Sequence, residues 1–199
     1  MNQPVTWIAA DATEIESAKQ TATAVLAGGC FWCTEAAFEQ IDGVLEVVSG
    51  FAGGSSETAT YQLVCGGKTG HAEVIRVIYD PAKLTYRQLL DIFFVAHDPT
   101  TLNRQGHDVG TQYRSAIFYA DEQQLQEARQ AIADWNASGK FSAPIVTQLE
   151  PLVEFFPAEL YHQDFARRYP DHPYIAGVSM PKLCKVQAYY PQLIRHRAP

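Results

Sequence analysis

The segment that most constrains the fold is a short apolar run that ends in two glycines and passes directly into a helical pattern. Thr21 to Ala27 is β-branched and apolar, and Gly28-Gly29 follows, which predicts a buried strand that ends in a sharp turn. Beyond the turn, small and apolar side chains recur at spacings of three and four residues: Cys30, Cys33, Ala37 and Ile41. This spacing predicts a helix that ends at Asp42-Gly43 and carries both thiols on one face.

Strand and helix patterns alternate along the rest of the chain. Further strands are predicted at Val44 to Phe51, His71 to Tyr79, Arg114 to Ala120, Ile145 to Leu149 and Leu152 to Phe155. Helices are predicted after the capping box of Thr85 and Gln88, at Asp121 to Ser138, at Pro157 to Tyr169, and once more after Tyr174. Strands interleaved with helices predict an α/β fold, a mixed sheet with helices packed on it.

Length and charge narrow the class of protein. The chain has 199 residues, 47% of them hydrophobic, and no repeat or low-complexity linker divides it. We expect a loosely attached arm at residues 1–20 and a single catalytic domain with an irregular tail at 21–199. The net charge of -7 argues against nucleic acid and anionic membranes as partners. No apolar run approaches the roughly 18 residues of a membrane span, so the expected location is cytoplasmic.

Four cysteines are too few for a disulfide scaffold, but two of them form a C-x-x-C pair. In a reducing compartment such a pair is redox-active or binds metal. Because Cys30 lies where a strand passes into a helix, the helix dipole and free N–H groups are expected to favour its thiolate over that of Cys33. The alternative is two small buried hydrophobic side chains. Phe31 and Trp32 are adjacent and cannot both face the core, so one is expected to line a cavity.

Glu73 is a candidate proton donor. It shares one face of its predicted strand with Ile75 and Val77, and burial of that face would raise its pKa. A carboxylic acid that stays protonated can act as a general acid. A solvated carboxylate at a strand end is the equally weighted alternative.

A polar stretch of about sixteen residues, Asp98 to Tyr113, is longer than most connections and is a second candidate site. Asp108, Tyr113 and Arg114 offer groups that could orient water and a polar substrate, although Asp108 and Arg114 could instead form an ordinary ion pair. Tyr61 could be a core aromatic or a pocket hydroxyl. The remaining candidates are expected to have structural roles. Cys65 is expected to be a small, packed hydrophobic side chain. His71 and His97 are expected to form hydrogen bonds rather than bind metal.

The octapeptide Gly-Gly-Cys-Phe-Trp-Cys-Thr-Glu at 28 to 35 resembles the signature of the peptide methionine sulfoxide reductase A family. Other blocks resemble that family in the same order: residues 69–74, 97–101, 108–115, 156–159 and 161–163. The resemblance spans roughly residues 22 to 190. It implies a ferredoxin-like two-layer sandwich and reduction of the S epimer of methionine sulfoxide, free or in proteins, with thioredoxin as the reductant.

The resemblance also implies a role for each matched residue. Cys30 would be the nucleophile that becomes a sulfenic acid, and Glu73 the acid. The substrate's methyl group would lie against Phe31 and Trp32, and its oxygen, or a water near it, would be bound by Tyr61, Asp108 and Tyr113. No metal and no other cofactor is expected, and the expected oligomeric state is a monomer.

A second thiol must then condense with the sulfenic acid. Many family members use a cysteine in a glycine-rich C-terminal tail, but residues 174–180 contain none. Cys33 is the favoured resolving cysteine because it lies on the same helix face as Cys30, and Cys184 is the alternative. Two other functions stay open from the residues alone: a general thiol-disulfide oxidoreductase, and a metal-binding interaction domain.

Overall fold

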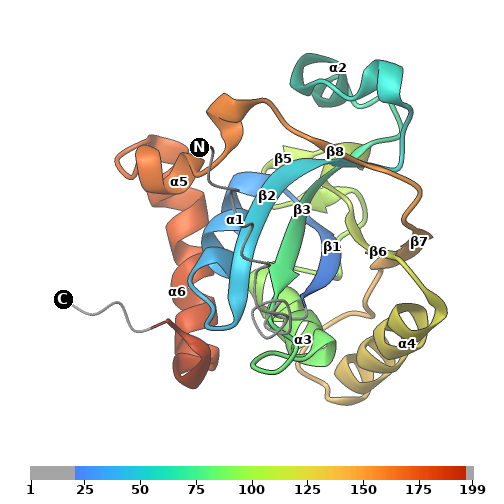
Figure 1. Ribbon diagram of the computed structural model, residues 1–199, viewed down its shortest axis with the longest axis vertical. Coiled ribbons are helices and arrows are strands. Elements are labelled where there is room, and N and C mark those ends of the chain that lie inside the picture. The colour runs from blue at the N-terminus through green and yellow to red at the C-terminus, as the bar shows by residue number, and fades with distance from the viewer. Residues whose placement is uncertain (1–20, 196–199) are drawn as a thin grey trace, which may run out of the picture.

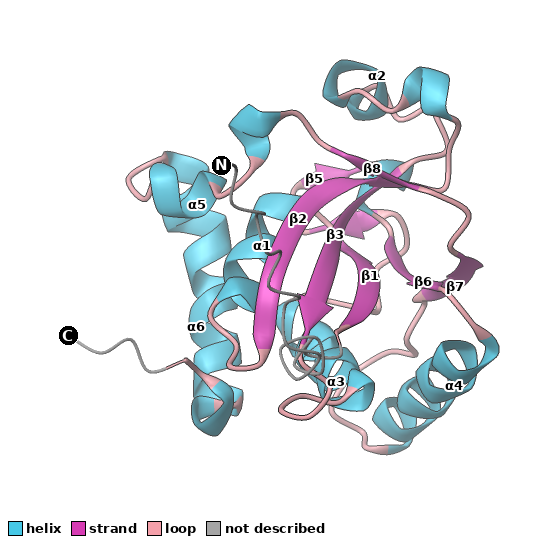
Figure 2. Ribbon diagram, in the orientation of Figure 1, coloured by secondary structure: helices cyan, strands magenta, loops and turns pink. Residues whose placement is uncertain are grey.

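A six-stranded mixed sheet forms the centre of the computed structural model, which describes residues 21–195 (Figures 1 and 2). Its strand order is β7-β6-β1-β3-β2-β8. The strands are β1 (Ala22–Gly28), β2 (Val44–Ala52), β3 (Ala72–Tyr79), β6 (Ser115–Tyr119), β7 (Gln148–Pro151) and β8 (Phe155–Pro157). All neighbours are antiparallel except β6 and β7. This confirms the predicted mixed sheet with helices. The expected N-terminal arm, residues 1–20, lies outside the described residues.

The helices differ in which part of the sheet they cover. They are α1 (Phe31–Glu39), α2 (Tyr61–Cys65), α3 (Tyr86–Ala96), α4 (Glu122–Ala137), α5 (Phe165–Arg168) and α6 (Met180–Tyr189), the last preceded by a π-helical turn at Ile175–Ser179. Helices α1, α3 and α6 pack against one another, and α1 and α3 also contact the central strands, whereas α4 contacts β6 (Figure 1). None of the helices between residues 21 and 195 is both long and apolar enough to span a membrane.

The two faces of the sheet carry separate apolar clusters. Alternate residues such as Leu26 and Ile75 point toward the helices, where they meet Phe38 and Phe93. The intervening residues form a smaller cluster on the other face: Val25, Ala27, Ala52, Ala72, Val74, Ala116 and Phe118, with Leu152 and Phe155 packed against it. Because side chains alternate along a strand, Glu73 points to the same face as Ile75, as predicted.

Capping residues identified in the sequence mark the starts of α3 and α4. The Thr85 side chain accepts from the backbone N–H of Gln88 and the Gln88 side chain accepts in return, which confirms the capping box of α3. At α4, Asp121 accepts from the backbone N–H of Gln124, and Gly139 follows the helix with a φ of 66°. The predicted helix at 121–138 is therefore confirmed to within a residue at each end.

The predicted helix at Pro157 to Tyr169 is wrong. Pro157 ends β8, opposite Gly50, and only a 3-10 turn (Leu160–His162) and the single turn of α5 follow. Two tertiary features prevent a longer helix. The Gln163 amide bonds both the N–H and the C=O of Ser49, each at 2.9 Å, and Asp164 has a left-handed φ of 54°.

Two smaller expectations also need correction, and β2 contains an irregularity. The strands β7 and β8 each begin three residues later than predicted. The pairing of β2 with β3 shifts between Val44 and Glu46, which buries Val44 and turns Leu45, 49% exposed, away from the core. The long polar stretch is partly regular, because it forms a hairpin of β4 (Arg104–Gln105) and β5 (Asp108–Val109) and a 3-10 turn at Thr111–Tyr113.

Candidate active site

The first turn of α1 places two thiols side by side in the interior. Gly29 has a φ of 90°, and a Cβ on it would come within 2.5 Å of the Gln105 side chain, so the sharp turn requires glycine. Cys30 is then the N-cap residue, and its carbonyl accepts from the backbone N–H of Cys33 at 3.1 Å. Their exposed fractions are only 7% for Cys30 and 1% for Cys33. The predicted common face of the two thiols is confirmed.

The surroundings of the two thiols shift their pKa values in opposite directions. Burial, the hydrogen bond with Cys33 and the nearby Glu73 raise the pKa of the Cys30 thiol well above its usual range. The hydrogen bond from Cys30 lowers the pKa of Cys33 to about 6 against the effect of burial, and Lys182 and Ser179 lower it further. The expectation that the helix start favours a thiolate at Cys30 is therefore wrong for the reduced pair. Two adjacent buried sulfurs do not both ionise, and the C-terminal segment favours Cys33.

Glu73 lies beside this helix start as a protonated carboxyl group. It is 2% exposed, and its Oε2 accepts from the backbone N–H of Phe31 at 3.0 Å. Burial raises its pKa to about 8 even though that hydrogen bond favours the carboxylate. At neutral pH Glu73 therefore carries a proton close to Cys30. Of the two interpretations drawn from the sequence, the buried acid is correct and the solvated carboxylate is not.

Two tyrosines and Asp108 lie in the electrostatic surroundings of Glu73. Burial raises the pKa of Tyr61 and of Tyr113, with a further contribution from Cys65 at Tyr61, so both phenols stay protonated. Asp108 Oδ2 accepts from the hydroxyl of Tyr174 at 2.6 Å. The structure thus brings Tyr61, Tyr113 and Asp108 into the surroundings of Glu73, although the sequence separates them widely.

Phe31 and Trp32 differ in burial, although both pack against the core and neither lines one of the main cavities within residues 21–195. Phe31 is 1% exposed and its ring contacts those of Phe51, Tyr61 and His162. Trp32 is partly exposed and lies face to face with Phe165 at 3.8 Å, with an interplanar angle of 7°. Phe31 is therefore fully inside the core, and Trp32 lies half-buried at its border.

Several site residues were not found from the sequence. They are Tyr174, whose hydroxyl lies 3.8 Å from Cys33 Sγ, Ser179, Lys182, His162 and Phe165. His162 and Phe165 fall in or next to a block that resembles the family, which could have signalled them. Nothing in the local sequence marks Tyr174, Ser179 or Lys182, because only the packing of α6 against α1 brings them to Cys33.

The remaining candidate residues are Arg114, two histidines and two cysteines, all outside the first turn of α1. Arg114 pairs with Glu150, at 2.9 Å from its Nε, and not with Asp108. Both ring nitrogens of His71 and of His97 are in hydrogen bonds, as expected. Cys65 is exposed, so its predicted burial as a packed hydrophobe is wrong. Cys184 is also exposed, on α6, whereas Cys33 hydrogen-bonds with Cys30 in the interior.

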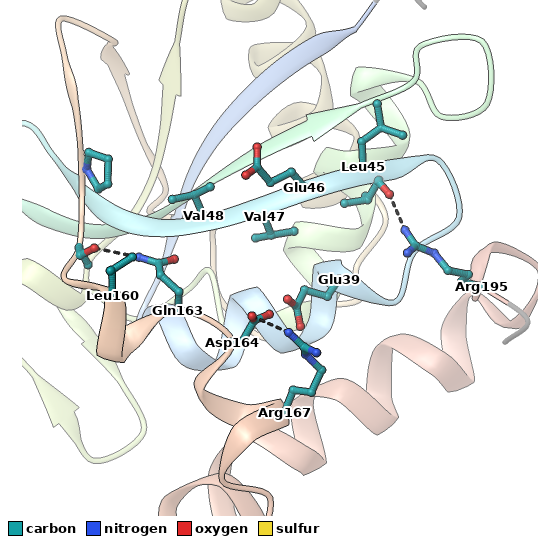
Figure 3. A pocket seen from close by; sticks show the side chains of 13 residues that line it. Glu39, Leu45, Glu46, Val47, Val48, Leu160, Gln163, Asp164, Arg167 and Arg195 are labelled. Carbon is teal, nitrogen blue, oxygen red and sulfur yellow. Dashed lines mark hydrogen bonds and ion pairs between the residues drawn. The ribbon is translucent and has the colours of Figure 1, made fainter.

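A separate groove of about 520 Å³ lies between the outer edge of β2 and α5 (Figure 3). Its polar side chains include Glu39, Asp164, Arg167 and Arg195. Burial and a hydrogen bond with Asp164 raise the pKa of Glu39 to about 8. None of the thiols or the residues grouped around Glu73 lines this groove, so it is distinct from the candidate active site.

A mixed α/β domain with a charged thiol pair next to a protonated carboxyl group defines a thiol-dependent oxidoreductase. The family model for peptide methionine sulfoxide reductase matches residues 22–193. The chain belongs to this family, whose members reduce methionine sulfoxide.

Known proteins agree with this assignment. A relative from Chromobacterium violaceum, peptide methionine sulfoxide reductase MsrA, is 51% identical over 173 residues, which cover 87% of this chain and 98% of the relative. Among solved structures, reduced Mxr1 from Saccharomyces cerevisiae is similar with a TM-score of 0.74 and 37% identity, covering 78% of this chain and 90% of that one. Mxr1 in complex with Trx2 matches with a TM-score of 0.53 and 28% identity, covering 80% and 90% of the two chains.

Proposed function

We propose that this enzyme reduces the S epimer of methionine sulfoxide, free and in proteins, in two steps. A sulfenic acid first forms on Cys30, and a disulfide between Cys30 and Cys33 then replaces it and is reduced by thioredoxin. The observation that carries the proposal is the buried Glu73, protonated at neutral pH and fixed to the residue after Cys30. A disulfide exchange reaction displaces a thiolate, which depends on a general acid far less than an oxygen that leaves a sulfoxide does.

In the first step, the S–H proton of Cys30 passes along the shared hydrogen bond to the Cys33 thiolate. The Cys30 thiolate then attacks the sulfoxide sulfur while Glu73 gives its proton to the oxygen. The substrate's sulfur–oxygen bond and the transient bond between the two sulfurs then break, and the hydroxyl group passes to the Cys30 sulfur as a new sulfur–oxygen bond. Methionine gains two electrons and the Cys30 sulfur loses two.

The surrounding side chains would bind the two ends of the sulfoxide. Trp32 would offer apolar surface for the methyl group, with the buried Phe31 ring packed against it from the core side. Hydroxyl donors for the oxygen would come from Tyr61 and Tyr113, both kept protonated by burial. Asp108 would act in the same cluster, where it already accepts from Tyr174.

In the second step, Cys33 would resolve the sulfenic acid. Its position one turn from Cys30 and its lowered pKa support this choice over the exposed Cys184. Thioredoxin as the reductant is supported by the similarity to Mxr1, which was solved in complex with Trx2. A dithiol reductant of this kind requires a reducing compartment, and we propose the cytoplasm.

The broader organisation is also part of the proposal. The order β6-β1-β3-β2, with α1 and α3 as the connecting helices, supports a ferredoxin-like arrangement of the central strands. Residues from β1 to α6 contribute to one site, so we propose one catalytic domain at residues 21–199. All of these groups come from one chain, which makes a monomer sufficient.

A single-turnover experiment tests the function. The reduced enzyme is mixed with either epimer of methionine sulfoxide without reductant, and we expect close to one methionine per chain from the S epimer only. Peptide mass mapping should then find Cys30 joined to Cys33. Cys30→Ser should abolish the reaction. Cys33→Ser should still release about one methionine per chain, more slowly because the acceptor of the Cys30 proton is lost, and should stop recycling by thioredoxin.

Cys184→Ser is the matched control and should recycle normally. Release of no methionine from either epimer would overturn the proposal. Reduction of protein disulfides that is unaffected by Glu73→Gln would favour the general thiol-disulfide oxidoreductase instead.

A further inference from the structure

The segment that leads into α6 surrounds the sulfur of Cys33. The Ser179 hydroxyl lies 3.1 Å from Cys33 Sγ, and both atoms are buried. Ser179 is the last residue of the π-helical turn Ile175–Ser179, the kind of irregularity that re-aims a helix and recurs at functional sites. This turn therefore directs a hydroxyl group at the second thiol.

Lys182, in the first turn of α6, adds a positive charge to the same place. Its Nζ is buried and has no hydrogen-bond partner within residues 21–195. A buried ammonium group without an acceptor is costly unless an opposite charge lies near. The charge of Lys182 acts on Cys33 and on His97, and burial keeps His97 neutral by lowering its pKa to about 3. The Cys33 thiolate is thus the negative charge that Lys182 faces.

Other elements also face Cys33, and their effect changes during the reaction. Cys30 and Glu73 approach it from the start of α1 and from β3, and the Tyr174 hydroxyl lies at 3.8 Å. In the reduced pair, the S–H group of Cys30 is the largest influence that favours the Cys33 thiolate. Once Cys30 carries a sulfenic acid, that S–H group no longer exists, and Glu73, having given up its proton, is negative.

We propose that Ser179 and Lys182 are positioning residues for the second step: while Cys30 carries the sulfenic acid, they favour release to solvent of the proton that Cys33 took from Cys30, and so return Cys33 to its thiolate. This inference rests on the proposed role of Cys33 as the resolving cysteine. The Cys33 thiolate attacks the Cys30 sulfur, a disulfide bond forms and the bond from Cys30 to its hydroxyl oxygen breaks. The hydroxide that leaves takes a proton from solvent and becomes water.

Lys182→Met and Ser179→Ala test the inference, with Lys185→Met as the matched control because Lys185 is exposed on the same helix. The first readout is the pH dependence of Cys33 alkylation in a Cys30→Ala background, followed on the Cys33 peptide by mass spectrometry because Cys65 and Cys184 are exposed. We expect the midpoint to rise by about one pH unit in Lys182→Met. Lys185→Met should leave it unchanged.

The second readout separates the two chemical steps in chains that retain Cys30. Methionine release in the first turnover should stay within about twofold of the parent. Disulfide formation should slow by roughly tenfold at pH 7, recover at pH 9, and be largely restored in Lys182→Arg. Melting curves that match the parent would show that the variants are folded.

Two results would overturn the inference, and only the second would also overturn the proposed role of Cys33. An unchanged alkylation profile, or unchanged disulfide formation in both Lys182→Met and Ser179→Ala, would refute it while the role of Cys33 stood. Disulfide formation on Cys30 in Cys33→Ser, through Cys184, would refute the resolving role itself and the inference with it.

Discussion

The backbone N–H of Phe31 donates to Oε2 of Glu73 at 3.0 Å, and this bond joins β3 to the first residue of α1. It holds a carboxyl group next to Cys30 without a salt bridge that would keep it ionised. Besides burial, the charges of Asp108 and Cys33 raise the pKa of Glu73. The proton on Glu73 and the negative charge on Cys33 therefore support each other.

Replacement of Glu73 by Gln should slow methionine release in a single turnover by about a hundredfold or more, the effect expected for loss of a positioned general acid. Gln keeps an oxygen that can accept from the Phe31 N–H, so the fold should be retained and the melting temperature serves as the check. A rate equal to that of the parent would remove Glu73 from the chemistry.

The single-turnover rate should follow a bell-shaped pH profile. Above the Cys33 pKa of about 6 the thiol pair carries one negative charge, so the rate rises as the pH passes this value. Glu73 donates only in its protonated form, so the rate falls as the pH rises through about 8. The falling limb should be absent in Glu73→Gln. A rate that stays flat from pH 6 to 9 in the parent enzyme would contradict these assignments.

Arg114→Met should lower the free energy of unfolding by about 3 kcal/mol, as expected when one partner of a largely buried ion pair is removed. The Arg114 side chain is 8% exposed, pairs with Glu150 and donates to the carbonyls of Thr111 and Gly70. Urea unfolding would measure the loss. Arg87→Met is the control, because its partly exposed ion pairs should contribute about 1 kcal/mol or less. Equal losses in the two variants would contradict the prediction.

Phe165→Leu should raise the KM for methionine sulfoxide with little change in kcat. The Phe165 ring stacks on Trp32 at 3.8 Å and fixes the apolar wall next to Cys30. An aromatic pair of this kind contributes about 1 kcal/mol, which corresponds to a change of roughly fivefold. Steady-state kinetics with a thioredoxin system would measure both constants. A lower kcat at an unchanged KM would show that Phe165 does not act through binding.

Most of the fold could be predicted from local spacing. The run before Gly28-Gly29 and the two-residue period that buries Glu73 identify strands, and the capping box at Thr85 identifies the start of α3, because each signal lies within one element. The same holds for the thiols of Cys30 and Cys33, which share a helix face by their spacing alone. These features depend on neighbours in sequence, so one sequence is enough to predict them.

The features that were missed depend on contacts between distant segments. The helix expected after Pro157 is interrupted because Gln163 bonds the backbone of Ser49, more than a hundred residues earlier. The lowered pKa of Cys33 was not foreseen because it depends first on the hydrogen bond from Cys30 and then on Lys182 and Ser179, which reach Cys33 only after α6 packs against α1. No local pattern in the sequence encodes either contact.

The residues that surround Cys33 come from opposite ends of the chain. Cys30 follows the first strand, and Ser179 directly precedes the last α-helix. Translation delivers Cys30, Cys33 and Glu73 early and the residues that pack around Cys33 last. On the proposed roles, a polypeptide truncated before residue 174 would keep both thiols but lack Ser179 and Lys182. Completion of synthesis would thus add the groups that set the pace of recycling.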